Sequence, residues 1–88
     1  MPYISQEARS RIKPHIEEFW KECSIIEEGE MNYIITQLLE HYREGKGKYS
    51  FFNKIIGLLE CIKLEYYRRV VAEYEDTKRQ DNGDVYHW

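Results

Sequence analysis

The stretch FFNKIIGLLECIKLEYYRRVVAEYEDTK, residues 51–78, decides the fold, because a helical pattern runs through its whole length. One apolar set recurs every three or four residues, as on one face of an α-helix: Phe52, Ile55, Leu59, Ile62, Tyr66 and Val70. A second, looser set follows another face: Phe51, Leu58, Cys61, Leu64, Tyr67 and Val71. With Ser50 as its N-cap, the stretch predicts one helix of about 40 Å that is apolar on two flanks.

The chain is short for such a helix, with 88 residues in all. A domain of this size buries only about 60–65% of the surface of its unfolded chain, so its own core is small. Two preceding helices would cover one flank of the long helix, and a second copy of the chain is the simplest cover for the other. We therefore predict a homo-oligomer, a dimer or higher, most simply a two-fold dimer.

Two shorter helices are predicted before the long one. Residues 5–23 carry an apolar stripe, and Ser5 is suited to cap their start. Because Pro14 has no N–H, we expect a short turn before Lys13 and the main helix from Pro14 to about Cys23. The second helix, residues 30–44, has apolar positions that fit one buried face: Met31, Ile34, Ile35, Leu38, Leu39 and Tyr42.

A tail of residues 79–88 follows the long helix. It contains the turn signal Asn82-Gly83 and ends on aromatic residues that a disordered tail usually lacks. We expect it to dock onto its own subunit or a neighbour, with a frayed terminus as the alternative. The predicted fold is therefore all-α: a single three-helix domain, 1–88, with a long C-terminal helix and a docking tail, oligomerising through helix packing.

Composition and charge narrow the function classes. The net charge is −3 with both signs mixed along the chain, and no basic block of the kind that binds duplex nucleic acid occurs. No apolar run is long enough to span a membrane, and the N-terminus is not a secretion signal, so we expect the cytoplasm. Cys23 and Cys61 fit helical apolar patterns, which is typical of reduced, buried thiols.

The sequence offers no pattern typical of an enzyme or a cofactor site. His15, His41 and His87 lack metal-ligand spacing, and no serine stands in a nucleophile elbow. The loop Gly45-Lys46-Gly47-Lys48 has residues that could hold a phosphate, but it lacks the Walker pattern. We therefore expect that loop to be a solvated turn and the protein to be a non-enzyme without a cofactor.

Charged residues of the long helix have two interpretations. Glu60, Lys63 and Tyr67 share one helical face, and Arg68 and Arg69 follow within the next turns. Intrahelical ion pairs worth a few tenths of a kcal/mol would account for them. Alternatively they form the wall of a pocket between subunits, in which the arginines grip a phosphate with paired hydrogen bonds.

Asn32, Tyr33 and Thr36 lie on the second helix, away from its apolar stripe. Asn32 and Thr36 are four residues apart, so both could contact one ligand or one neighbouring chain. The alternative is that the three side chains form a solvated face.

Several motifs resemble a family of small proteins of unknown function that phages and prophages encode. They are Met1-Pro2-Tyr3-Ile4, the stretches MNYIITQLL (31–39), IGLLECIKLE (56–65) and YRRVVAEYED (67–76), and the closing NGDVY (82–86). Together they cover nearly the whole chain. Members of that family often have proline where this chain has Glu73, which puts the path of the tail in question.

The resemblance implies a function class, because small oligomeric phage proteins often inhibit host defence, some by sequestering a nucleotide signal between subunits. Our first hypothesis is such an anti-defence binding protein, whose tyrosines stack on a base and whose cations hold phosphate. The alternative is a module that binds a host or phage protein through aromatic and arginine hot spots. For the nucleotide site we predict Asn32, Tyr33, Thr36, Lys63, Tyr67, Arg68, Arg69, Asp84 and Tyr86.

Overall fold

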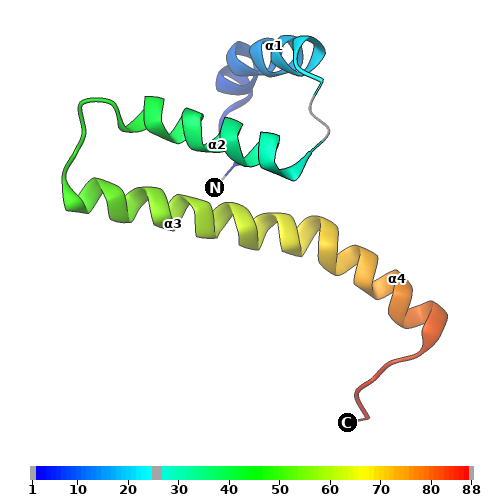
Figure 1. Cartoon of the computed structure of the whole chain (residues 1–88). Helices are drawn as coiled ribbons and strands as arrows, with labels where there is room; N and C mark the ends of the chain where they lie inside the picture. Colours follow the sequence, from blue (N-terminus) through cyan, green and yellow to red (C-terminus); the bar gives the residue numbers. More distant parts are fainter. Residues whose placement is uncertain (1, 25–26, 88) are drawn as a thin grey trace. The chain divides into compact units, whose positions relative to one another are not determined.

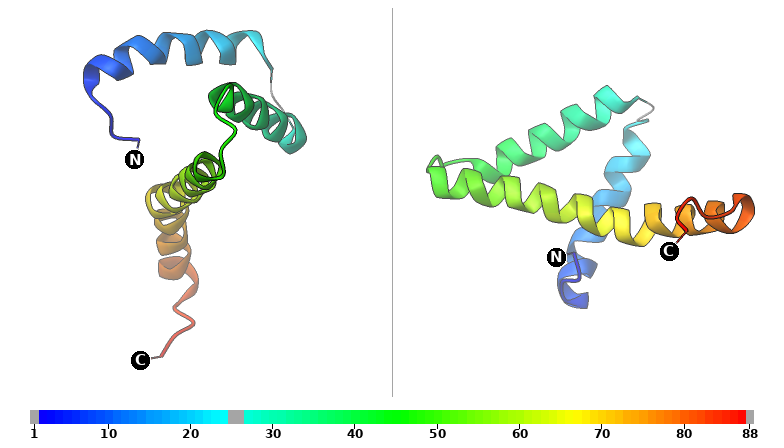
Figure 2. Two further views of the ribbon diagram at one scale, coloured as in Figure 1. Left: turned by 90° about the vertical axis from the view of Figure 1, so that its left-hand side faces the viewer. Right: turned by 90° about the horizontal axis from the view of Figure 1, so that it is seen from below.

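The computed structural model describes residues 2–24 and 27–87, which form helices and no strand (Figure 1). The last helical segments join end to end, so the C-terminal helix is 34 residues long and continuous in both views of Figure 2. The prediction of an all-α fold with a long C-terminal helix is confirmed. The elements are α1 (Gln6–Glu22), α2 (Glu28–Arg43), α3 (Tyr49–Tyr66), the π-helical segment η1 (Tyr67–Val71) and α4 (Ala72–Asn82).

The chain divides into two compact units, whose boundary lies within α3. The first unit runs from Pro2 to Ile55, and the second begins at Ile56. In the described residues, no helix is long and apolar enough to cross a membrane.

The first helix begins where the sequence predicted. The hydroxyl oxygen of Ser5 accepts a hydrogen bond from the backbone N–H of Ala8 at 3.2 Å, as an N-cap residue does. The expected break at Pro14 is wrong, because α1 is continuous from Gln6 to Glu22. Proline costs an interior helix one hydrogen bond because it has no N–H, and here that loss does not interrupt the helix.

Removing the cap of α1 is expected to lower the free energy of unfolding. Ser5→Ala should cost about 1 kcal/mol, because the N–H of Ala8 loses its acceptor. Ser5→Asp should restore the stability, since its carboxylate also accepts this bond. Urea unfolding at one fixed protein concentration would measure both. Ser10→Ala, inside the same helix, is the control, and an equal loss there would contradict the assignment.

The second helix begins two residues before the predicted start, at Glu28 instead of Glu30. The sequence argument placed Gly29 outside the helix, but a glycine in the first turn costs less than one in the interior. Glu28 and Glu30 lie in that turn, where negative charge is favourable to the helix dipole. The end, at Arg43, is one residue before the predicted Glu44.

The C-terminal helix is longer than predicted at both ends. It begins at Tyr49 instead of Phe51, so Ser50 lies in the first turn and the predicted cap is wrong. It also continues to Asn82, so the first four residues of the predicted tail are helical. Gly83 ends it with a φ of 90°, a value that favours glycine. Of the predicted aromatic end of the tail, Trp88 lies outside the described residues.

None of the described residues is buried. Leu38 of α2 is 62% exposed, and Ile56 and Leu64 of α3 are 64% and 57% exposed. Burying one such side chain stabilises a fold by about 1.5–3 kcal/mol, and burial of this kind is what offsets the entropy lost in ordering a backbone. Each unit therefore has apolar helix faces that its own residues leave open to solvent.

Candidate ligand-binding site

Three of the predicted residues come together on α2. The hydroxyl of Thr36 donates a hydrogen bond to Oδ1 of Asn32 at 3.3 Å, one helical turn away. Both line a shallow hollow that they share with Tyr33, Glu28 and Gly29. The side chain of Tyr33 is 65% exposed, so its ring is open to a stacking partner. The predicted polar face of α2 is therefore a group of adjacent donors and acceptors beside an aromatic ring.

The charge around this group decides which part of a ligand suits it. Tyr33 and Gly29 also line an adjoining hollow, whose wall contains Glu27 and Glu30. With Glu28 in the first hollow, three glutamates line the two hollows that Tyr33 also lines. Negative charge disfavours a phosphate there, because like charges repel. The face suits a base or sugar, which offers N–H and O–H donors to carboxylates and amides.

Two of the predicted cations of α3 and η1, Lys63 and Arg68, are paired with carboxylates of their own helix. Nζ of Lys63 lies 3.2 Å from Oε1 of Glu60, and Nη2 of Arg68 lies 2.9 Å from Oε2 of Glu65. Both pairs join residues three apart, as the ion-pair interpretation predicted. The pair of Lys63 and Glu60 is exposed on both sides and contributes little to stability, so a ligand phosphate could take the place of the Glu60 carboxylate. The carboxylate of Glu65 is only 23% exposed.

Tyr67 makes a side-chain contact that spans about two turns of the helix. Its phenol donates a hydrogen bond to the carboxylate of Glu75, eight residues along the chain. That hydrogen bond, helped by the negative charge of Glu75, raises the pKa of Tyr67 above its ordinary value. The contact holds the ring of Tyr67 along the helix, so this predicted site residue has a defined orientation.

Arg68 and Arg69 both lie in the π-helical segment η1. The N–H of Ala72 donates to the carbonyl of Tyr67, five residues back, where an α-helix would join residues four apart. Segments of this kind occur often at functional sites. The sequence did not predict η1, since its residues also fit an uninterrupted helical pattern.

The remaining predicted residues lie after the C-terminal helix. The backbone N–H of Tyr86 donates to Oδ1 of Asp84 at 2.8 Å, a local turn that fixes the short segment after Gly83. Tyr86 is 62% exposed. Three of the nine predicted residues therefore lie in the unit Pro2–Ile55, and the other six lie in the unit from Ile56 onward.

Neutralising the acceptor of Tyr67 is expected to move the pKa of its phenol toward the ordinary value. In Glu75→Gln the amide oxygen can still accept the hydrogen bond, but it lacks the negative charge that disfavours ionisation of the phenol. In the native chain the contact persists at neutral pH and is lost as pH rises through the raised pKa. A pH titration followed by NMR with ring-labelled tyrosine would measure the change. Glu73→Gln is the control, and an unchanged pKa in Glu75→Gln would contradict the contact.

The comparison with known families decides where the chain belongs. The family described as "Domain of unknown function (DUF6899)" matches residues 1–85. The chain belongs to this family. No curated protein and no solved structure matches it. The match includes the opening motif and residues 82–85 of the closing motif, so the whole DUF6899 domain is the unit whose function has to be explained.

Metal ligation has no candidate in the part of this DUF6899 chain that the structure describes. Within residues 2–24 and 27–87, no group of three or more His, Cys, Asp or Glu side chains could hold a metal ion. Cys23 and Cys61 are free thiols.

Proposed function

We propose that this DUF6899 chain is a non-enzymatic binding protein that assembles from several copies and sequesters a nucleotide-derived signalling molecule between them. The observation that supports assembly is the lack of any buried residue in the described chain, together with its open apolar faces. A chain that buries nothing by itself gains its hydrophobic stabilisation from a partner.

A second copy of the same chain is the partner that best suits these faces. Identical subunits present identical faces to each other, and closed symmetric assemblies are the commonest arrangement in soluble oligomers. Apolar side chains lie on both flanks of α3, including Ile62 and Leu64, at 55% and 57% exposure. Two open flanks on one helix favour contacts with more than one other helix.

The ligand is argued from the chemistry of the two residue sets. Around Tyr33, a stacking ring and carboxylates suit a base or sugar. Lys63, Arg68 and Arg69 supply the positive charge that a phosphate requires. A nucleotide carries both parts, so it would join the α2 face of one copy to the cationic helix of another. Asp84 and Tyr86 would then close the site from the tail.

The setting follows from the resemblance of the motifs to a phage-encoded family. In the cytoplasm of an infected cell, a protein that holds a defence signal tightly without converting it would prevent that signal from reaching its receptor. Capture without catalysis requires only high affinity and a high copy number.

Two measurements test this function. Light scattering should give a mass of at least two chains at micromolar concentration. Calorimetry against cyclic mono- and oligonucleotides should find a submicromolar ligand that is recovered intact after the protein is denatured. A well-folded monomer, or chemical conversion of the ligand, would contradict the proposal.

A protein-binding module is the second candidate. The ion pairs of Lys63 and Arg68 with their own helix favour it, because those cations already have carboxylate partners. The open apolar faces would then receive another protein. Binding of a host protein with no response to any nucleotide would favour this candidate over the first.

A further inference from the structure

The loop between α2 and α3 and the start of α3 carry charge of one sign. Residues 45–59 contain Lys46, Lys48 and Lys54, and none of the sixteen carboxylates of the chain. The protein as a whole has a net charge of −3, so this segment opposes the overall balance. Three positive charges without a counter-charge repel each other, and a bound anion would relieve that repulsion.

The three lysines line one hollow. Its volume is about 380 Å³, within the range of small-molecule sites, and its other lining residues are Gly45, Gly47, Ser50 and Phe51. In the described part of the chain, none of these three ammonium groups forms an ion pair with a carboxylate. Lys13 and Lys63, by contrast, each pair with a glutamate of their own helix.

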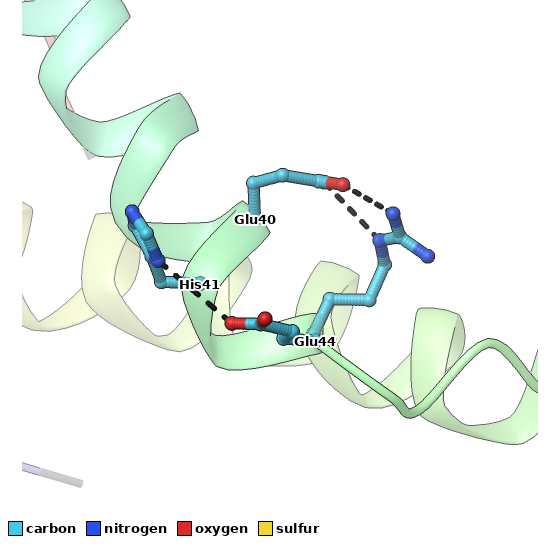
Figure 3. Close-up of polar contacts among 4 residues, drawn as sticks. Glu40, His41 and Glu44 are labelled. Carbon is cyan, nitrogen blue, oxygen red and sulfur yellow. Dashed lines mark hydrogen bonds and ion pairs between the residues drawn. The ribbon is translucent and has the colours of Figure 1, made fainter.

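The carboxylates nearest in sequence have other partners. Glu40 is held by the guanidinium of Arg43, with Nε 3.1 Å from Oε2, and this hydrogen bond lowers the pKa of Glu40. Glu44 lies 4.0 Å from Nδ1 of His41 and is directed to that side of α2 in Figure 3. Both carboxylates therefore contact side chains of α2, and in the described chain neither forms an ion pair with a lysine of the loop.

Aromatic side chains position Lys46 at the edge of this hollow. The rings of Tyr42 and Phe51 lie 5.3 Å apart across the loop, and Nζ of Lys46 is 5.8 Å and 5.7 Å from their centroids. Cation–π contact of this kind holds an ammonium group without neutralising it. The sequence signal for it is an aromatic residue on each side of a glycine-lysine turn, one in the last turn of α2 and the other in the first turn of α3.

The backbone adds to the positive potential. The carbonyl of Lys48 accepts hydrogen bonds from the N–H groups of Phe51 and Phe52, at 3.0 Å and 3.1 Å, so α3 starts beside Lys48. The first N–H groups of a helix have no intrahelical acceptor and carry the positive end of its dipole. They supplement the lysines here. Gly45, with a φ of 77°, lets the chain turn sharply into the loop.

We propose that this hollow is a phosphate-binding site formed by Lys46, Lys48 and Lys54. It goes beyond the proposed function, because it shares no residue with the nucleotide site. Three ammonium groups around one hollow suit a dianion with several acceptor oxygens better than a single carboxylate, and lysine is a common phosphate ligand. The phosphate would belong to a soluble phosphate ester or to the headgroup of an anionic lipid.

The experiment is a titration of the full chain with inorganic phosphate, followed by NMR of backbone amides. Resonances of Gly45, Gly47 and Ser50 should move and saturate, whereas sodium chloride at equal ionic strength should not saturate them. The double variant Lys48→Ala/Lys54→Ala should weaken phosphate binding at least tenfold. Both side chains are exposed, so circular dichroism should report an unchanged helix content.

The matched control is Lys78→Ala. Lys78 lies on α4, outside the hollow, with its Nζ 5.6 Å from the ring centroid of Tyr74, so its removal deletes a lysine charge elsewhere on the chain. Phosphate binding should not change in this variant. An equal loss in the control, or phosphate shifts that match those of chloride, would overturn the site.

Vesicle binding separates the two sources of phosphate. Co-sedimentation with phosphatidylglycerol vesicles but not with phosphatidylcholine, lost in the double variant, would assign the site to a lipid headgroup. Saturation by free phosphate without vesicle binding would assign it to a soluble phosphate ester. Failure in both arms would overturn the site while leaving the nucleotide site of the proposed function unaffected.

Discussion

Replacing Leu64 with lysine is expected to dissociate the assembly and to remove its cooperative unfolding. In a single chain this side chain is 57% exposed, and a polar substitution at such a position changes stability by about 0.5 kcal/mol or less. Between two copies, the same lysine would be an unpaired charge in an apolar contact, which costs about 3–5 kcal/mol. The two cases differ by at least about 2.5 kcal/mol, or roughly sixtyfold in association, so light scattering across a dilution series distinguishes them.

Asn53→Lys is the matched control for this experiment. Asn53 lies on the same helix and is already exposed and polar, so the added charge should leave the mass and the unfolding midpoint unchanged. If Leu64→Lys also keeps the mass and midpoint of the parent chain, that side chain is solvated in the native state. The proposed assembly through α3 would then be wrong.

Removing the guanidinium of Arg69 is expected to abolish nucleotide capture while the assembly persists. Arg69 lies in η1 next to Arg68, and truncating one partner of a charged, hydrogen-bonded contact costs about 2–5 kcal/mol. Arg69→Ala should therefore raise the dissociation constant of the nucleotide about thirtyfold or more. Calorimetry measures the affinity, and light scattering on the same sample measures the mass.

The control for Arg69 is another arginine of the same continuous helix. Arg79 lies on α4, where its Nη2 is 3.6 Å from Oδ1 of Asp76, and it is outside the predicted site. Arg79→Ala should bind as the parent chain does. Equal affinities of Arg69→Ala and the parent chain would remove the arginines from the site and favour the protein-binding alternative.

Local patterns in the sequence predicted the helices well. The cap at Ser5 and the long C-terminal helix follow from capping preference and from spacings of three and four residues, which depend on neighbours in the chain. Pro14 was misread, since the same residue can begin a helix or lie within one. The position of Gly29 in the first turn of α2 was missed for a similar reason.

The contacts that define the candidate sites were harder to predict. Tyr67 and Glu75 are eight residues apart, and nothing in a helical pattern singles out that pair. Tyr42, Lys46 and Phe51 meet only because a turn brings two helix ends together. The absence of the Walker pattern led to the prediction of a solvated turn. That absence excludes only one geometry of phosphate site, so it could not exclude a site formed by lysines alone.

The π-helical segment η1 contains one residue more per turn than an α-helix, which changes the direction of the side chains that follow it. One inserted residue rotates the following part of a helix by roughly 100° about its axis. The side chains of α4 therefore do not continue the apolar faces of α3. The charged side chains of α4 thus have an orientation that is independent of the apolar faces of α3. In the proposed assembly, substitutions of the charged residues of α4 would therefore leave the apolar contacts of α3 unchanged.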